Sequence, residues 1–304
     1  MWLPRKMFSR ILAAVLLCGP AVFASGAEAQ TKAASSTGAG DFEAAKRAAK
    51  LGRDSEAMSL YIRSAQSGNA EAMFEIAVLH QEGKGTEKNP TLAFRWLEQA
   101  ALRGNPNAIN RIGYSYFYGI GVTRNNVLAR RWWEQAALRG SATAMYNLGA
   151  SYRDGDVGPI DYILAKRWFQ QAADRGDVES YVALGYLYAE GLGTKRDYCQ
   201  AMVWYRKASD ANDPMGINNY GALFENGQCV AKNEAEARRL YSKAAELGAP
   251  YAKSNLDRLD NRGRDDWGTI SGSSDTAGDY GGVWRGCNYA CRQKREAAES
   301  VGVY

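Results

Sequence analysis

The hydrophobic residues between positions 70 and 105 form two stripes, separated by a polar stretch that contains glycine. Residues of the second stripe follow the i, i+3, i+4, i+7 spacing of one helix face: Ala93, Trp96, Leu97 and Ala100. The first stripe also has a helical spacing: Ala72, Ile76, Ala77 and His80. The pattern predicts two α-helices, over about 70–81 and about 90–102, which bury these stripes against each other.

This helix pair recurs with a period of 36 residues. Tryptophan occupies one position of four consecutive units, and a second column contains only glycine: Trp96, Trp132, Trp168 and Trp204; Gly83, Gly119, Gly155, Gly191 and Gly227. Five full units follow one another without gaps: 70–105, 106–141, 142–177, 178–213 and 214–249. Such a period predicts an all-α solenoid of helix-turn-helix repeats, in which each repeat packs on its neighbours.

Residues that begin and end helices occupy fixed positions in each unit. Side chains that cap helix N-termini form two columns: Asn69, Asn105, Ser141, Asp177 and Asp213; Asn89, Asn125, Asp161, Asp197 and Asn233. Residues that tolerate a left-handed backbone follow the second helix: Gly104, Gly140, Gly176, Asn212 and Gly248. The sequence therefore marks both ends of the helices as well as their buried faces.

Glycine also occurs inside the first helix of four units: Gly113, Gly149, Gly185 and Gly221. The first unit has Ala77 at this position. A glycine in a helix costs about 1 kcal/mol relative to alanine. We therefore expect a neighbouring backbone to approach closely at this column, with the buried indole of the tryptophan column laid over the gap.

The motif Leu148-Gly149-x-x-Tyr152-x-x-Gly155, followed by Ala165-Lys166-x-Trp168 and Ala172-Ala173, resembles the Sel-one-like (SLR) repeat, a relative of the tetratricopeptide repeat. The resemblance covers about residues 54–259 and implies a right-handed superhelix. Two loops depart from it, because Val157 and Cys229 stand where other units have a second loop glycine. We expect these two loops to differ in shape from the others.

By the resemblance to tetratricopeptide proteins, another stripe of the first helices lines a concave groove. This stripe changes from repeat to repeat, as a binding surface does. Its aromatic residues provide rigid contacts, and its amides and one arginine provide hydrogen bonds, which suits an extended peptide or a glycan. We assign partner binding to Asn107, Asn110, Tyr114, Phe117, Tyr146, Arg153, Tyr186 and Asn218.

The two ends of the chain differ from the repeats. Residues 1–29 combine basic residues, a short apolar run and a small-residue cleavage site, which is typical of a secretory signal peptide. We expect a flexible segment at 30–40, a partial capping repeat at 41–69 and a capping helix at 250–260. A Gly/Ser-rich linker at 261–283 and a cysteine-containing tail at 284–304 follow. The sequence predicts a periplasmic or secreted protein with no stable membrane insertion.

Few residues point to chemistry. The single histidine, His80, replaces an aromatic packing residue of the other repeats, and a multi-histidine metal site is impossible. Nucleophile-elbow and P-loop motifs are absent, so we predict no catalytic residue, metal or cofactor, with a carboxylate pair as the open alternative. Removal of residues 1–29 lowers the net charge from +5 to +3, which is too small to indicate nucleic-acid binding.

Four cysteines follow the predicted signal peptide, and an exported protein can form disulfides. Cys199 begins the second helix of the fourth repeat and Cys229 lies in the loop of the fifth, so we favour a structural disulfide between them. Cys287 and Cys291 are four residues apart in the tail. These two can pair with each other, stay free or bridge to another chain.

The predicted function is a non-catalytic scaffold that binds a protein or peptide partner in its groove. The resemblance to exported SLR proteins implies a role in envelope signalling or complex assembly. The same resemblance implies an alternative, a peptidoglycan-related or β-lactam-binding or β-lactam-hydrolysing envelope protein. A third hypothesis is a redox or envelope-stress sensor that works through Cys287 and Cys291.

Overall fold

The computed structural model describes residues 38–156 and 158–265, and every regular element in these ranges is a helix. Residues 38–50 are helical, and α2 (Asp54–Gln66) follows them. The five repeats supply α3 (Ala70–Glu82) and α4 (Pro90–Leu102), α5 (Pro106–Tyr118) and α6 (Asn126–Leu138), α7 (Ala142–Asp154) and α8 (Tyr162–Ala173), α9 (Val178–Glu190) and α10 (Tyr198–Asp210), and α11 (Pro214–Asn226) and α12 (Glu234–Glu246). The last helix is α13 (Ala252–Asp265).

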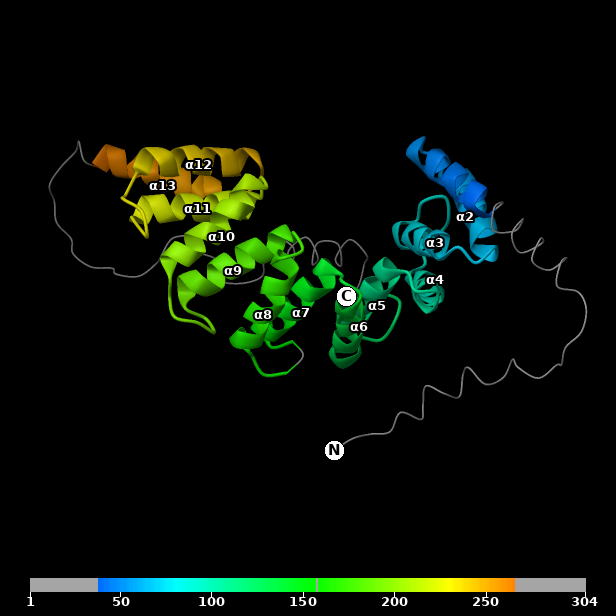
Figure 1. Ribbon diagram of the computed structural model, residues 1–304. Helices are drawn as coiled ribbons and strands as arrows, with labels where there is room; N and C mark the ends of the chain where they lie inside the picture. The colour runs from blue at the N-terminus through cyan, green and yellow to red at the C-terminus, as the bar shows by residue number, and fades with distance from the viewer. Residues whose placement is uncertain (1–37, 157, 266–304) are drawn as a thin grey trace, which may run out of the picture.

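Each helix packs mainly on the helices that precede and follow it in the chain. The helix pairs follow one another in an arch, with α2 at one end and α12 and α13 at the other (Figure 1). The all-α solenoid predicted from the 36-residue period is confirmed. The predicted helix at 90–102 is α4, and the helix predicted at about 70–81 is α3, which ends one residue later.

The predicted capping residues begin the helices of all five repeats. Each of the ten side chains accepts a hydrogen bond from a backbone N–H of its first turn. For example, Asn105 Oδ1 accepts from Ala108 N at 2.8 Å. The residues after the second helices have the predicted left-handed backbone, and Asn212 has a φ of 57°. Contacts local to the helix ends therefore produce the same two-helix unit five times.

The glycines inside the first helices face aromatic rings, but not those of the tryptophan column. The facing pairs are Gly113–Trp133, Gly149–Phe169, Gly185–Tyr205 and Gly221–Tyr241. These rings belong to the residue that follows the tryptophan column, and most tryptophans of that column are only half-buried: Trp96, Trp132 and Trp168. The expected tryptophan contact is wrong, because one step along a helix turns a side chain by about 100°.

In the first, second and fourth repeats, a second glycine in the loop between the two helices lies against the backbone of the preceding helix pair. A Cβ on Gly193 would lie 2.5 Å from the backbone carbonyl carbon of Tyr162, the first residue of α8. Cys229 stands at this position in the fifth repeat and has a φ of 63°, as Gly193 does. The expectation that the Cys229 loop differs in shape is therefore wrong, because Cys229 adopts the glycine conformation. Val157 lies outside the described residues.

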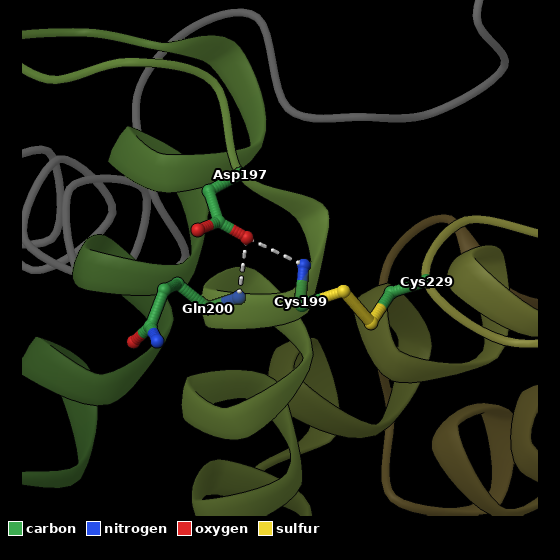
Figure 2. Close-up of a disulfide and its surroundings, with 4 residues drawn as sticks. All are labelled: Asp197, Cys199, Gln200 and Cys229. Carbon is green, nitrogen blue, oxygen red and sulfur yellow. Dashed lines mark hydrogen bonds between the residues drawn. A yellow bond between two sulfur atoms is a disulfide. The ribbon is translucent and has the colours of Figure 1, made fainter.

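The predicted Cys199–Cys229 disulfide is present and links α10 to the loop before α12 (Figure 2). Cys199 is the second residue of α10, and its backbone N–H donates to the carboxylate of Asp197, which caps this helix, at 2.9 Å. The disulfide therefore joins the fifth repeat to the first turn of α10. Gly85, Gly121 and Gly193 make the equivalent contact in three other repeats without a covalent bond.

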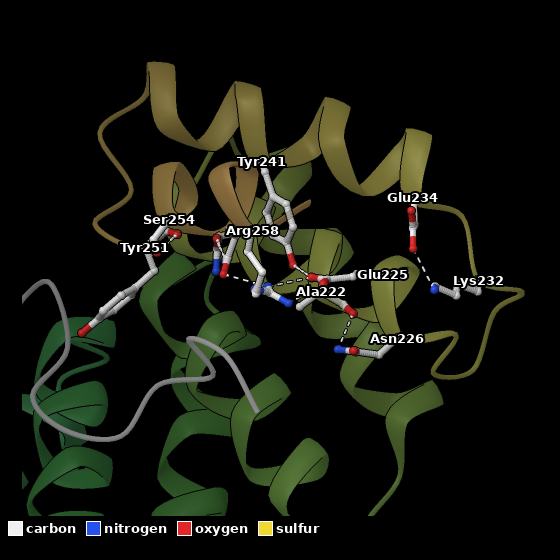
Figure 3. Close-up of polar contacts among 11 residues, drawn as sticks. Ala222, Glu225, Asn226, Lys232, Glu234, Tyr241, Tyr251, Ser254 and Arg258 are labelled. Atoms are coloured by element: carbon white, nitrogen blue, oxygen red, sulfur yellow. Dashed lines mark hydrogen bonds and ion pairs between the residues drawn. The ribbon is translucent and has the colours of Figure 1, made fainter. Parts of the chain in front are cut away.

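The closing helix α13 is held by a buried polar group. The carboxylate of Glu225, whose side chain is 1% exposed, pairs with the guanidinium of Arg258 from α13 (Figure 3). The hydroxyl of Tyr241 on α12 donates to the same carboxylate at 2.8 Å. These contacts join α11, α12 and α13 at the end of the solenoid.

The ends of the solenoid differ in detail from the predicted boundaries. Helix begins at residue 38, inside the segment predicted at 30–40, and three residues connect it to α2. The partial repeat predicted at 41–69 is therefore a pair of helices with a short turn. The last helix continues to Asp265, past the predicted end at 260. The predicted signal peptide, most of the predicted linker and the predicted tail lie outside the described residues.

Candidate functional site

The eight residues assigned to the groove lie on the first helices of the repeats and differ in exposure. Asn107 is exposed, and four others are half-buried: Asn110, Tyr114, Phe117 and Tyr186. Three are buried, with exposed fractions of 2%, 7% and 1%: Tyr146, Arg153 and Asn218. The assigned stripe therefore contains surface residues and residues that lie beneath them.

Four of the eight residues border one open pocket between α5 and α7. Tyr114 and Phe117 line it from α5, and Tyr146 and Arg153 line it from α7. The other lining residues were not predicted: Tyr118, Trp133, Asn147, Ala150, Ser151, Asp154 and Asp156. We refer to this cavity as the α5–α7 pocket.

Aromatic rings in mutual contact form much of the pocket wall. The ring centroids of Tyr114 and Tyr118 are 4.4 Å apart. The ring of Phe117 lies 4.8 Å from that of Tyr118 and 5.4 Å from that of Trp133. Tyr114 and Tyr118 are one helical turn apart, so α5 presents both rings on one side. The helix thus fixes a set of large, rigid contact surfaces at the pocket.

An ion pair between a buried arginine and an exposed aspartate lies beside these rings. Arg153 Nε and Nη2 donate to the two carboxylate oxygens of Asp154, both at 2.6 Å. The guanidinium carbon of Arg153 also lies 6.0 Å from the ring centroid of Phe169. Because Arg153 is buried, its charge requires a partner such as Asp154.

Asp156 supplies a second carboxylate from the loop after α7. Partial burial raises the pKa of this carboxyl, and the charge of Asp154 raises it further, while Arg124 and Arg153 lower it. Burial also raises the pKa of the Tyr118 hydroxyl, which is therefore neutral at physiological pH. The pocket thus combines neutral aromatic rings with closely spaced charges.

The remaining groove residues lie outside this pocket. Asn110 Oδ1 is 3.4 Å from Asn147 Nδ2, which joins α5 to α7. Asn218 accepts a hydrogen bond from Asn255 of α13 at 2.9 Å and is covered by that helix. Asn107 and Tyr186 line no part of the pocket. Of the lining residues that sequence reasoning missed, Tyr118 and Asp154 are 36 residues apart, so the period itself could have identified this column.

The remaining candidates from the sequence are the single histidine, the two tail cysteines, a metal site and a membrane-spanning helix. His80 is buried in α3, at 7% exposure, as expected for a packing residue. Cys287 and Cys291 lie outside the described residues. Within the described ranges, no group of three or more His, Cys, Asp or Glu side chains could hold a metal ion. No helix in this part of the chain is both long and apolar enough to cross a membrane.

The repeats match a known family model, that of the Sel1 repeat, at residues 70–105, 106–141, 142–177, 178–213 and 214–248. The chain belongs to the Sel1 repeat family. The resemblance inferred from the glycine, alanine and tryptophan motifs is therefore confirmed. Sel1 repeats generally mediate protein–protein interactions, and the scaffolds that they form are generally non-enzymatic.

Two solved structures resemble this Sel1 repeat protein. A protective antigen of uropathogenic Escherichia coli that displays an SLR fold is 28% identical, over 77% of this chain and 51% of that one, with a TM-score of 0.69. The chain thus spans about half the length of that antigen. A Sel1 repeat protein from Oxalobacter formigenes is 24% identical, over 85% of this chain and 96% of that one, with a TM-score of 0.68, and shares the fold. No curated protein matches the chain.

Proposed function

We propose that this Sel1 repeat protein is an exported scaffold that binds a protein segment in a concave groove. The groove is the face formed by the first helices of the repeats, α3, α5, α7, α9 and α11. The α5–α7 pocket carries the proposal, since side chains of two repeats border one open cavity there. A pocket of this kind buries an anchoring side chain of a partner, and rigid aromatic rings lose little conformational entropy on binding.

The variation in sequence between repeats also supports partner binding at the face formed by the first helices. The column of Tyr114 changes at every step: Val78, Tyr114, Ala150, Tyr186 and Ala222. A packing column of the second helices is constant: Ala93, Ala129, Ala165, Ala201 and Ala237. All five alanines are fully buried, so packing dictates their size. The changing column is free of that constraint and can differ to suit a partner.

Two features favour an exported protein. Residues 1–29 have the composition of a secretory signal peptide. The Cys199–Cys229 disulfide suits an oxidising compartment such as the periplasm or the cell exterior. A role in envelope signalling or complex assembly belongs to the same proposal. The comparisons give no support to the peptidoglycan-related alternative.

Site-specific photo-crosslinking in the native cells tests the groove. A photoreactive amino acid replaces Asn107 of α5 or Thr143 of α7, which are exposed residues of the first helices. Gln135 of α6 and Gln171 of α8 are exposed residues of the second helices and serve as matched controls. We expect both groove positions to give an adduct with the same protein and the controls to give none. Adducts from the control positions alone, or from none of the four, would overturn the groove assignment.

Export is tested separately by fractionating the same cells. We expect the protein in the periplasmic or extracellular fraction, with residues 1–29 removed, as N-terminal mass spectrometry would show. A protein that stays in the cytoplasm with residues 1–29 intact would contradict the export part of the proposal and leave the groove untouched.

A further inference from the structure

The charges that line the α5–α7 pocket do not balance. Arg153 and Asp154 neutralise each other through two hydrogen bonds of 2.6 Å. Asp156 also lines the pocket, and within the described residues its carboxylate has neither a hydrogen bond nor an ion pair. Asn126 Nδ2 donates to the backbone carbonyl of Asp156 instead, at 2.7 Å. One carboxylate therefore remains without a direct partner.

Two cations lie near the pocket rings outside the Arg153–Asp154 pair: Arg111, whose guanidinium carbon is 6.0 Å from the ring centroid of Tyr114, and Arg124, which also acts on Asp156. Arg124 is the one of the two that could compensate this carboxylate. Arg124 is exposed and lines no part of the pocket; its Nε donates to Asn126 Oδ1 at 3.2 Å, and its guanidinium carbon lies 5.7 Å from the ring centroid of Phe117. Solvent screens an exposed charge. The pKa of Asp156 stays raised despite Arg124 and Arg153, so these cations do not fully compensate its ionised form.

Neutral aromatic rings line the same pocket as this carboxylate. Burial raises the pKa values of the Tyr114 and Tyr118 hydroxyls, so neither ring carries a charge at physiological pH. The face of an aromatic ring attracts a cation by about 0.5–2 kcal/mol, depending on exposure. A carboxylate beside such rings favours an apolar stem that ends in a positive charge. It disfavours an acidic side chain, because Arg153, the cation within the pocket, is already paired with Asp154.

The acid is particular to the third repeat. Its position is occupied in the other repeats by Lys84, Ile120, Leu192 and Gln228. Residues as different as these show that the repeat fold does not require a carboxylate there. The raised pKa of Asp156 also means that ionisation of this side chain opposes folding, so packing gives no reason for an acid.

We infer that the α5–α7 pocket receives a lysine or arginine side chain of the bound protein segment. The charged end lies at Asp156, and the methylene groups lie against Tyr114 and Tyr118. The inference rests on the proposed groove and adds the chemical class of the side chain that anchors the partner in it. An apolar side chain in the pocket would remove water from Asp156 without supplying a positive charge. The pocket therefore disfavours partners with an apolar side chain at this position and favours those with a lysine or arginine.

Three blocked pentapeptides test the inference on the full mature chain. Each has glycine at four positions, and the central residue is lysine, norleucine or glutamate. Binding is followed by chemical-shift changes of the isotope-labelled protein. We expect the lysine peptide to bind roughly five- to tenfold more tightly than the norleucine peptide, which has the same stem without the charge. The glutamate peptide should give no saturable shift.

Two variants locate the effect. Asp156→Asn should reduce the affinity for the lysine peptide towards that for the norleucine peptide, and the part of the preference that remains would come from the aromatic rings. Asp174→Asn removes an exposed carboxylate at the end of α8 and should leave all three affinities unchanged. Circular dichroism checks that Asp156→Asn folds, which we expect because the ionised carboxylate does not contribute to stability.

Several results would overturn the inference: equal affinity for lysine and norleucine, tighter binding of glutamate, no effect of Asp156→Asn, or no shift with any peptide. None of these results would contradict the groove assignment, which is tested by the cross-links from Asn107 and Thr143. If Asn107 and Thr143 gave no cross-links but the lysine peptide still bound more tightly, the pocket would bind cations and the proposed groove would be rejected.

Discussion

Gly149 and Phe169 are in such close contact that a β-carbon on Gly149 would lie 2.6 Å from Cδ1 of the ring. Phe169 is fully buried, so its ring has no free space to move into. Gly149→Ala gains about 1 kcal/mol in helix propensity but overpacks the core, which costs about 1–3 kcal/mol and sometimes more. We expect a net loss of stability of up to about 2 kcal/mol, measured as a lower urea midpoint of unfolding.

The first repeat indicates how this loss can be recovered. Its residues at the positions of Gly149 and Phe169 are Ala77 and Leu97, and both are fully buried. Phe169→Leu alone leaves space in the core and costs about 1–2 kcal/mol. Combined with Gly149→Ala, it should restore at least about 1 kcal/mol relative to the sum of the single changes. Strictly additive losses in this double-mutant cycle would show that the two residues do not limit each other.

The repeats were predictable from the sequence because the same local rules recur in each of them. Asn105 caps α5 through a contact three residues away, so a period in the sequence becomes a period in the structure. The choice between Trp168 and Phe169 as the partner of Gly149 was harder, since both are aromatic and adjacent. The first repeat distinguishes the two candidates, because it has Ala77 at the position of Gly149 and Leu97 at the position of Phe169 but keeps tryptophan at the position of Trp168.

The site was predictable only in part, because it depends on contacts between repeats. A helical stripe placed Tyr114 and Phe117 on one face, and the structure brings both to the pocket. Asp156 was missed because it lies in a loop, where helical spacing gives no guide. Asn218 has the right spacing but lies under α13, and no regular repeat shows how the closing helix covers the last one.

Loss of the Cys199–Cys229 disulfide should weaken the contact between the fourth and fifth repeats. The two residues are 30 apart, and a crosslink of this length contributes about 3–4 kcal/mol in the chain-entropy model. The double change Cys199→Ala/Cys229→Ala should therefore lower the free energy of unfolding by about that amount. Urea unfolding of the oxidised parent and the double variant measures the difference.

A glycine at position 229 provides the matched variant. Cys229 has a φ of 63°, and a residue with a side chain costs roughly 1–2 kcal/mol in this left-handed region. Cys199→Ala/Cys229→Gly should therefore be more stable than Cys199→Ala/Cys229→Ala by about 1 kcal/mol, although neither can form the bond. Equal stability of the two variants would mean that the loop changes conformation once the disulfide is absent.

Arg258→Met should detach α13 more effectively than loss of any surface ion pair. It removes the cation that pairs with the buried carboxylate of Glu225 and leaves the hydrogen bond from the Tyr241 hydroxyl, and a buried charge without its ion-pair partner costs about 3–5 kcal/mol. Hydrogen exchange of α13 amides should rise strongly in this variant. Glu225→Gln added to Arg258→Met should recover part of the loss, because the uncompensated charge is then gone.

A second ion pair between α12 and α13 serves as the control. Arg238 and Asp260 are 3.1 Å apart, with side chains 45% and 51% exposed. Exposed pairs contribute about 0–1 kcal/mol, so Arg238→Met should change the stability of α13 little. Comparable losses in Arg238→Met and Arg258→Met would indicate that burial of Glu225 does not set the strength of the closing contact.

The stability of the chain should depend on pH through Asp156 in an unusual direction. Burial raises the pKa of this carboxyl above its ordinary value of 3.8, and the groups that act on it are Asp154, Arg124 and Arg153. A raised pKa means that the folded chain binds the proton more tightly than the unfolded chain. The stabilising contribution of Asp156 is therefore present below pH 3.8 and is lost as the pH rises through the raised value. Asp156→Asn should be more stable than the parent at pH 7, and this difference should disappear under acid conditions.

The neighbouring acid should behave in the opposite way, since Asp154 accepts two hydrogen bonds from the buried Arg153, and the Asp156 carboxylate accepts none within the described residues. Asp154→Asn removes the carboxylate that accepts two hydrogen bonds from Arg153 and should cost about 1–3 kcal/mol at pH 7. Thermal unfolding of the two variants at pH 7 and pH 4 measures the contrast. A loss of stability at pH 7 in Asp156→Asn would assign Asp156 a structural role. A gain of stability would mean that the acid at the pocket lowers the stability of the free chain, as expected for a side chain whose charge is compensated only when a cationic partner binds.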